Sequence, residues 1–186
     1  MITLIAHQLC WIKGELDDPN DHCAHGRIEF TVNETLFIKP EDGEWTVSAA
    51  GLYLLRTLSF DHEPGDAVTE QNFLFPCCGH GLWLNENTSE FGVICLGCGT
   101  GIDVTVYHTE NRMVELSLGE KKAVVSKAEW RSAVLAFAVQ VTNFYASCTP
   151  KVKPDDNIVR EGWAAFWQEW DNRMQTVTGN ASIFMT

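Results

Sequence analysis

The chain has 186 residues, 45% of them hydrophobic and 20% charged, which is the size and composition of one globular domain that can bury a core without disulfides. Its formal net charge of −12 would repel phosphate backbones and anionic lipid headgroups, so binding to nucleic acid or to a membrane surface is disfavoured. No stretch reaches about 18 uninterrupted apolar residues, and the opening MITLIAHQLCWIKGELDD lacks a basic leader, so we expect a cytoplasmic protein.

The first third of the chain predicts a strand, a hairpin and a helix. Residues 2–12 have the composition of an opening strand. In IEFTVNETLFIK, apolar and polar residues alternate around the Asn-Glu pair at 33–34, which predicts a hairpin. The stretch SAAGLYLLRTLSF, residues 48–60, has leucines at helical spacing and can be capped by Thr46 or Ser48. We therefore expect a buried helix there.

The middle of the chain changes to short extended runs separated by Gly, Asn, Glu and Ser. Runs of this kind at close spacing predict an antiparallel meander. The runs are FLF, GLWLN, FGVIC, IDVTVYH and MVELSL.

Two helices are predicted near the C-terminus. Ser126 and Glu129 have the spacing of a capping box, in which each residue hydrogen-bonds to the backbone N–H of the other, before an apolar-periodic stretch over 130–145. The segment TPKVKPDD then ends this helix, because proline cannot continue it, and Asp155 or Asp156 can cap the next one. One face of the last helix gathers Trp163, Phe166, Trp167, Trp170 and Met174.

These elements predict an α+β fold, with an antiparallel β-sheet meander covered by one internal helix and two C-terminal helices. We expect a single domain over residues 1–175 and a mobile tail over 176–186, because the closing TVTGNASIFMT shows no clear pattern. The aromatic face of the last helix is interpreted as core, with a lid or a dimer contact as the alternative.

The sharpest chemical pattern lies between residues 75 and 99, FPCCGHGLWLNENTSEFGVICLGCG. Cys77, His80, Cys95 and Cys98 form the spacing C-x2-H-x14-C-x2-C. Glycine follows each pair, which suits a tight knuckle of backbone N–H groups around a thiolate. The polar turn between the pairs could form a hairpin that brings both knuckles to one tetrahedral ion. The segment resembles a zinc ribbon, and the resemblance implies a structural zinc ion held by these four residues.

Other readings of the cysteines stay open. Cys78 is a rival ligand beside Cys77, Cys23 or His25 could replace a proposed ligand, and His22 and His62 are weaker candidates. The thiols could instead be small buried side chains, because an odd total of seven in a reducing cytosol does not form a disulfide framework. A third reading is catalytic, with the thiol of Cys77 or Cys78 activated by a histidine.

The loop DHEPGD, residues 61–66, gathers three carboxylates and a histidine that could hold a divalent ion, although such loops are usually solvated turns. The segments SAAGLYLLRTL, PCCGH and FWQEW resemble those of small acidic bacterial proteins of unassigned activity. That resemblance implies a bacterial cytoplasmic setting and no catalytic residues.

The function expected from these observations is a non-catalytic protein-interaction module. It would bind a protein partner, basic in charge, in the manner of an immunity-like neutraliser, because the chain is strongly acidic and has no evident active site. The alternative is a metal- or thiol-dependent hydrolase that uses the Cys/His cluster.

Overall fold

The computed structural model describes residues 1–14, 16–77, 81–86 and 90–178. Over these residues the fold is α+β, with α-helices packed against several antiparallel sheets, as the sequence predicts.

The N-terminal quarter of the chain forms a four-stranded antiparallel sheet. β2 is central and pairs with β1 along most of its length, with β3 beyond the 33–34 turn, and with β4. Ile28, Phe30 and Val32 alternate along β2 and are fully buried, so one face of the sheet is core. Asn33 adopts a left-handed backbone with φ of 53°, as a tight two-residue hairpin turn requires. The strands are β1 (Ile2–Trp11), β2 (Ala24–Val32), β3 (Thr35–Ile38) and β4 (Trp45–Thr46).

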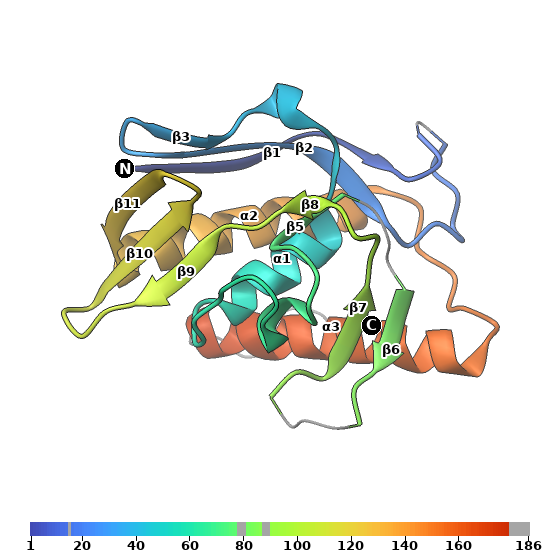
Figure 1. Ribbon diagram of the computed structural model, residues 1–186. Coiled ribbons are helices and arrows are strands. Elements are labelled where there is room, and N and C mark those ends of the chain that lie inside the picture. Colours follow the sequence, from blue (N-terminus) through green and yellow to red (C-terminus); the bar gives the residue numbers. More distant parts are fainter. Residues whose placement is uncertain (15, 78–80, 87–89, 179–186) are drawn as a thin grey trace.

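Three α-helices lie beneath this sheet. α1 is buried along its whole length and lies between the sheet and α3 (Figure 1). α2 packs along β1 and beside α1 (Figure 1). None of the helices within the described ranges is both long and apolar enough to cross a membrane. The helices are α1 (Val47–Arg56), α2 (Lys127–Ser147) and α3 (Asn157–Thr178), and short 3-10 turns occupy η1 (Pro40–Asp42) and η2 (Ala67–Thr69).

The caps of α2 and α3 follow the predicted chemistry, whereas Thr46, at the N-cap position of α1, makes no capping hydrogen bond with its side chain. The Ser126 hydroxyl accepts a hydrogen bond from Glu129 N at 3.2 Å, and the Glu129 carboxylate accepts one from Ser126 N at 3.1 Å. This reciprocal pair confirms the predicted capping box at the start of α2. The Asp156 carboxylate accepts hydrogen bonds from the backbone N–H groups of Ile158 and Val159, so Asp156 caps α3. α3 continues to Thr178, and residues 179–186 lie outside the described part of the chain.

The middle of the chain forms antiparallel strands that divide into separate small sheets. β5 pairs with β8, β6 pairs with β7, and β10 lies between β9 and β11. The predicted runs thus contain strands. The segment after the 119–120 turn forms a further strand, β11, which was not predicted from the sequence. The strands are β5 (Phe75–Pro76), β6 (Gly81–Leu84), β7 (Val93–Leu96), β8 (Gly101–Ile102), β9 (Thr105–His108), β10 (Met113–Leu118) and β11 (Lys121–Ser126).

Side-chain chemistry explains the break between β8 and β9. The Asp103 carboxylate accepts hydrogen bonds from Leu74 N at 2.9 Å and lies 2.7 Å from Nε2 of the buried His62. The backbone of His62 in turn exchanges two hydrogen bonds with Val106. Asp103 therefore lies outside both strands, and its side chain and hydrogen-bond partners link three segments of the chain.

Two glycines set the position of α3. A Cβ at Gly51 in α1 would lie 2.5 Å from the Trp170 ring of α3, so the missing side chain admits the indole. A Cβ at Gly162 in α3 would overlap the backbone carbonyl of Leu82 in β6. α3 therefore lies against both the central helix and the β6–β7 hairpin because these two side chains are absent.

Candidate functional site

The structure places Cys95, a predicted zinc ligand, in the hydrophobic core. Cys95 follows Val93 by two residues on β7, so both side chains face the core, and Cys95 is only 1% exposed. Its carbonyl accepts a hydrogen bond from the Tyr53 hydroxyl of α1 at 2.9 Å. Desolvation raises the pKa of the Cys95 thiol to about 12. At neutral pH the thiol is therefore protonated, which is the opposite of an activated nucleophile.

Cys77 and Cys98, two more predicted ligands, lie on either side of Thr100. The backbone N–H of Cys77 donates to the carbonyl of Thr100 at 3.0 Å, and Sγ of Cys98 lies 3.0 Å from the Thr100 hydroxyl. Both cysteines are half-buried at the end of the β5–β8 pair. The structure thus brings these two segments together.

The fourth predicted ligand, His80, and its rival Cys78 lie outside the described residues. Within the ranges that the structure describes, no group of three or more Cys, His, Asp or Glu side chains is arranged to hold a metal ion. The zinc site therefore stays a prediction.

The histidines weighed as replacement ligands hold segments of the fold together. His25 is buried, with Nδ1 3.2 Å from the carbonyl of Cys23 and Nε2 3.3 Å from the hydroxyl of Thr46. His22 Nε2 lies 2.7 Å from the carbonyl of Val152, in the connection between α2 and α3. These contacts link β2 to β4 and to that connection.

The acidic loop at residues 61–66 also makes contacts within the protein. The Asp61 carboxylate accepts a hydrogen bond from His108 N at 2.7 Å and lies 2.8 Å from the His108 ring. The Asp66 carboxylate caps η2 through Val68 N. These contacts fit the expectation of an ordinary turn that ends α1 and leads into η2.

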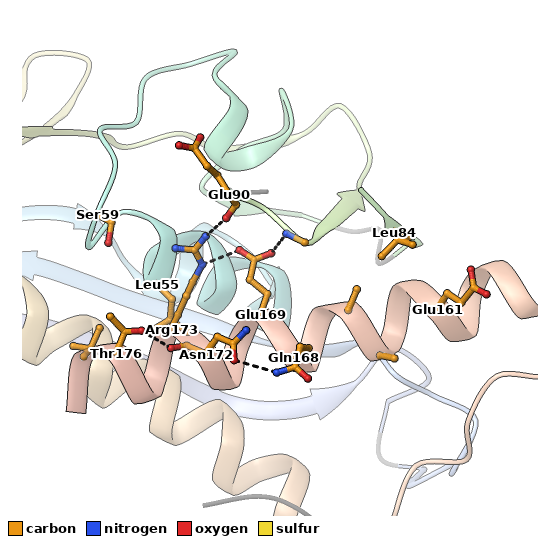
Figure 2. Close-up of a pocket in the computed structure, with 14 residues that line it drawn as sticks. Leu55, Ser59, Leu84, Glu90, Glu161, Gln168, Glu169, Asn172, Arg173 and Thr176 are labelled. Carbon is orange, nitrogen blue, oxygen red and sulfur yellow. Dashed lines mark hydrogen bonds and ion pairs between the residues drawn. The ribbon is translucent and has the colours of Figure 1, made fainter. Parts of the chain in front are cut away.

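A groove of about 710 Å³ lies between α3 and the start of β7 (Figure 2). Its polar side chains come mainly from successive turns of α3, and its apolar ones from α1, β6 and the end of α3. The described lining residues are Leu55, Ser59, Leu84, Glu90, Gly92, Glu161, Ala164, Ala165, Gln168, Glu169, Asn172, Arg173, Thr176 and Val177.

The floor of the groove is a buried network of charges around Glu169. Oε1 accepts hydrogen bonds from Nε of Arg56 at 2.8 Å and from Nε of Arg173 at 2.7 Å. Oε2 accepts one from Arg56 at 2.9 Å and one from Gly92 N at 2.8 Å. Arg173 also donates to the carbonyl of Glu90 at 2.7 Å, so α3 holds the chain at two points just before β7, at the loop end of the β6–β7 hairpin (Figure 2).

Arg56 has no exposed surface and its donors are used within the fold. Besides Glu169, its guanidinium donates to the carbonyls of Val68 at 2.8 Å and Val93 at 2.7 Å. It also lies 4.6 Å from the ring centroid of Phe91, a cation–π distance. One side chain thus joins α1 to η2, β7 and α3. This role was not predicted from the sequence, although a single arginine within the apolar run AAGLYLLRTL was a visible signal.

The network holds Glu169 in its ionised form. Burial raises the pKa of Glu169, but the hydrogen bonds and charges of Arg56 and Arg173 outweigh it and bring that pKa below its ordinary value. A carboxylate with four donors around it is a poor proton carrier at neutral pH. The floor therefore acts as a rigid electrostatic anchor for the hairpin.

One segment of the chain, which includes part of the groove wall, is strongly acidic. Residues 57–111 contain eight carboxylates and no lysine or arginine, and so contribute two thirds of the net charge of −12. This segment includes the loop after α1, the β6–β7 hairpin and β9. Five of its carboxylates are on exposed residues: Asp61, Glu63, Glu86, Glu90 and Glu110.

Exposed apolar side chains accompany this charge on the hairpin. Trp83 is 51%, Leu84 45% and Leu96 44% exposed. In the β6–β7 register Trp83 pairs with Ile94 and Gly81 with Leu96, so Trp83 and Leu96 lie on one face. Ile158, in the first turn of the adjacent α3, is 62% exposed. We call the exposed carboxylates of 57–111 together with Trp83, Leu84 and Leu96 the acidic face, although in the strand register Leu84 lies on the opposite side of the hairpin from Trp83 and Leu96.

Comparison of the chain with protein-family models, with curated proteins and with solved structures found no match to any of them.

Proposed function

We propose that this chain is a non-catalytic protein-interaction module of the cytoplasm that binds a basic protein through the acidic face, as an immunity-like neutraliser does. The observation that carries the proposal is the concentration of charge, since eight carboxylates without a lysine or arginine fall in one segment of the chain. A surface of one charge attracts a partner of the opposite charge over long range and speeds their encounter.

The apolar side chains of the acidic face would supply binding energy that charge attraction alone does not provide. Binding energy at protein interfaces is concentrated in a few large side chains, with tryptophan prominent among them. Trp83 is half-exposed on a hairpin whose loop end, just before β7, is held by Glu169 and Arg173. Because the hairpin is anchored before binding, little conformational freedom is lost when a partner docks.

The groove beside the hairpin suits the side chains of a basic partner. Glu90 and Glu161 are exposed at its rim, and Gln168 and Asn172 line it from α3. A lysine or arginine that enters the groove would meet the exposed carboxylates of Glu90 and Glu161, while the arginine of the groove wall, Arg173, is paired with Glu169. The groove thereby adds a concave binding surface to the charge of the acidic face.

The proposal is tested by capture of partners from a lysate of the native host at low and at high salt. The bait is the full chain, compared with the double variant Glu86→Lys, Glu90→Lys and with the variant Trp83→Ser. We expect a basic protein that the wild type retains at low salt and releases at high salt, because salt screens exposed charges. Both variants should lose it.

The matched control is the double variant Glu34→Lys, Glu41→Lys, which makes the same charge change on exposed residues of the 33–34 turn and η1. These residues lie on the far side of the molecule from the hairpin (Figure 1). The control should retain the partner. Equal loss with the control, or no salt-sensitive partner at all, contradicts the proposal.

A further inference from the structure

A second cavity, of about 370 Å³, lies between the C-terminal half of α2 and the first half of α3, away from the acidic face. Aromatic rings and two charged side chains surround it. Its described lining residues are Thr142, Tyr145, Ala146, Lys151, Trp163, Trp167 and Asp171.

Two of the three ring pairs in this cavity stand nearly at right angles, and the third, Tyr145 with Trp163, is tilted by 43°. The centroids of Trp163 and Trp167 are 5.5 Å apart with planes at 89°, and those of Tyr145 and Trp167 are 4.9 Å apart with planes at 84°. Both tryptophans are only half-buried, so part of each ring borders the cavity. The faces of such rings are electron-rich, and a cation near them is attracted.

Asp171 gives the cavity an uncompensated negative charge. It follows Trp167 by one turn of α3, is half-buried, and has no hydrogen bond or ion pair with any residue that the structure describes. Desolvation raises the pKa of this carboxyl. Thr142, on the α2 side, adds a buried hydroxyl oxygen without a hydrogen-bond partner among the described groups. The cavity thus contains two polar groups whose bonding capacity is unused.

The positive charge of Lys151, which lines the cavity, is already neutralised by a carboxylate outside the cavity lining. Its Nζ is 2.8 Å from the Asp17 carboxylate, 3.0 Å from the carbonyl of Asp18, and 3.4 Å from the ring centroid of Trp11. This contact shows that the aromatic cluster at this end of the molecule accommodates one ammonium group. It also leaves Asp171 as the charge that a ligand would neutralise.

We infer that this cavity binds an alkylammonium cation, with the aromatic rings of Trp163 and Trp167 around the charged head and the Asp171 carboxylate as its counter-ion. The ammonium N–H groups would donate to the Asp171 carboxylate, which gives it a hydrogen-bonded counter-charge. This site is independent of the acidic face. We therefore expect binding to require a positive charge on the ligand, which a purely apolar cavity would not require.

The experiment is a calorimetric titration of the full chain with butylammonium and with 1-butanol, an uncharged compound of the same length. We expect saturable binding of butylammonium and none of 1-butanol over the same range. Asp171→Asn should weaken butylammonium binding by about tenfold or more, because a charge-assisted bond is replaced by a neutral one. Trp167→Leu should weaken it about threefold to tenfold, which is what loss of one cation–π contact gives.

The control variant is Asp155→Asn, which removes an exposed carboxylate from the segment before α3 and should leave the affinity unchanged. Far-UV and near-UV circular dichroism of each variant checks that it folds as the wild type does. Equal binding of the alcohol, absence of saturable butylammonium binding, or an Asp171→Asn variant with wild-type affinity would each overturn the inference.

Two further probes identify the source of the cation. Nα-acetyl-lysine amide carries the same butylammonium group on a peptide backbone. If it binds as tightly as butylammonium, the cavity receives a lysine side chain from a protein. If butylammonium binds and the lysine derivative does not, the ligand is a small free amine.

Discussion

The carboxylate of Glu169 in α3 accepts two hydrogen bonds, at 2.8 and 2.9 Å, from the fully buried guanidinium of Arg56 in α1. The pair is separated by 113 residues in the sequence. It closes the contact between the central helix and the last helix, and it supports the floor of the groove beside the acidic face.

Breaking the pair of Arg56 and Glu169 should destabilise the fold. Glu169→Gln leaves Arg56 with an uncompensated charge in the core and should lower the free energy of unfolding by about 3 kcal/mol or more. Urea unfolding followed by tryptophan fluorescence measures it. Glu161→Gln, on an exposed position of the same helix, should change it by less than about 0.5 kcal/mol. Equal effects of the two variants would refute a special role for the pair.

The same pair predicts a pH dependence. The pKa of Glu169 is raised by burial and lowered more strongly by the arginines, with a net value below the ordinary 4.5. A carboxyl with a lowered folded-state pKa stabilises the fold above its unfolded-state pKa, and this contribution is lost as pH falls through the folded value. The stability difference between wild type and Glu169→Gln should therefore be full at neutral pH and shrink below pH 4.5. A pH-independent difference would contradict this account.

Asp171, two residues later, should behave in the opposite way. Desolvation raises its pKa above the ordinary 3.8, so the ionised carboxylate opposes folding. Asp171→Asn should stabilise the protein at neutral pH by less than about 1 kcal/mol, because the side chain is partly solvated. This gain should vanish below pH 3.8, where both states are protonated in the wild type. Thermal unfolding of both proteins across this pH range shows whether the signs differ as expected.

Gly162 allows a direct test of how the hairpin is placed. Gly162→Ala would put a methyl group into the carbonyl of Leu82, and the backbone of β6 must move to relieve it. We expect a loss of about 1–3 kcal/mol in unfolding free energy, even though alanine favours helix, and faster amide exchange in β6. Gly99→Ala, with no atom within 4 Å of its new Cβ, is the control. Unchanged exchange in β6 after Gly162→Ala would argue against this packing.

The zinc site is tested by metal content and by thiol reactivity. We propose that the four predicted ligands hold a structural zinc ion, so protein purified without added metal should contain zinc in near-stoichiometric amount, and Cys98→Ser should lose it while Cys148→Ser keeps it. Without metal, iodoacetamide should modify Cys98 before Cys95, because Cys95 is 1% exposed and its thiol pKa is raised to about 12 by desolvation. Wild-type protein without zinc would rule the site out.

Local chemistry made several elements predictable from the sequence. The reciprocal bonds of Ser126 and Glu129 depend on residues three apart, and the turn at Asn33 depends on its own backbone preference. Such interactions need no knowledge of the rest of the fold. The α+β class and the three helices followed from them and from hydrophobic periodicity.

The interactions between distant segments were not predictable in the same way. Asp103 interrupts a strand-like run because its partners, His62 and Leu74, come from another part of the chain. The partner of Arg56 was likewise invisible, since no pattern ties residue 56 to residue 169. The inward direction of Cys95 could have been read from its alternation with Val93 along FGVIC.

The distance in sequence between Arg56 and Glu169 has a consequence for biosynthesis. At about 5–20 residues per second, the ribosome adds the 113 residues between them in on the order of ten seconds. Until then a nascent chain that buried α1 would hold a lone guanidinium in its interior. We therefore expect α1 to reach its final packing only after α3 has been synthesised.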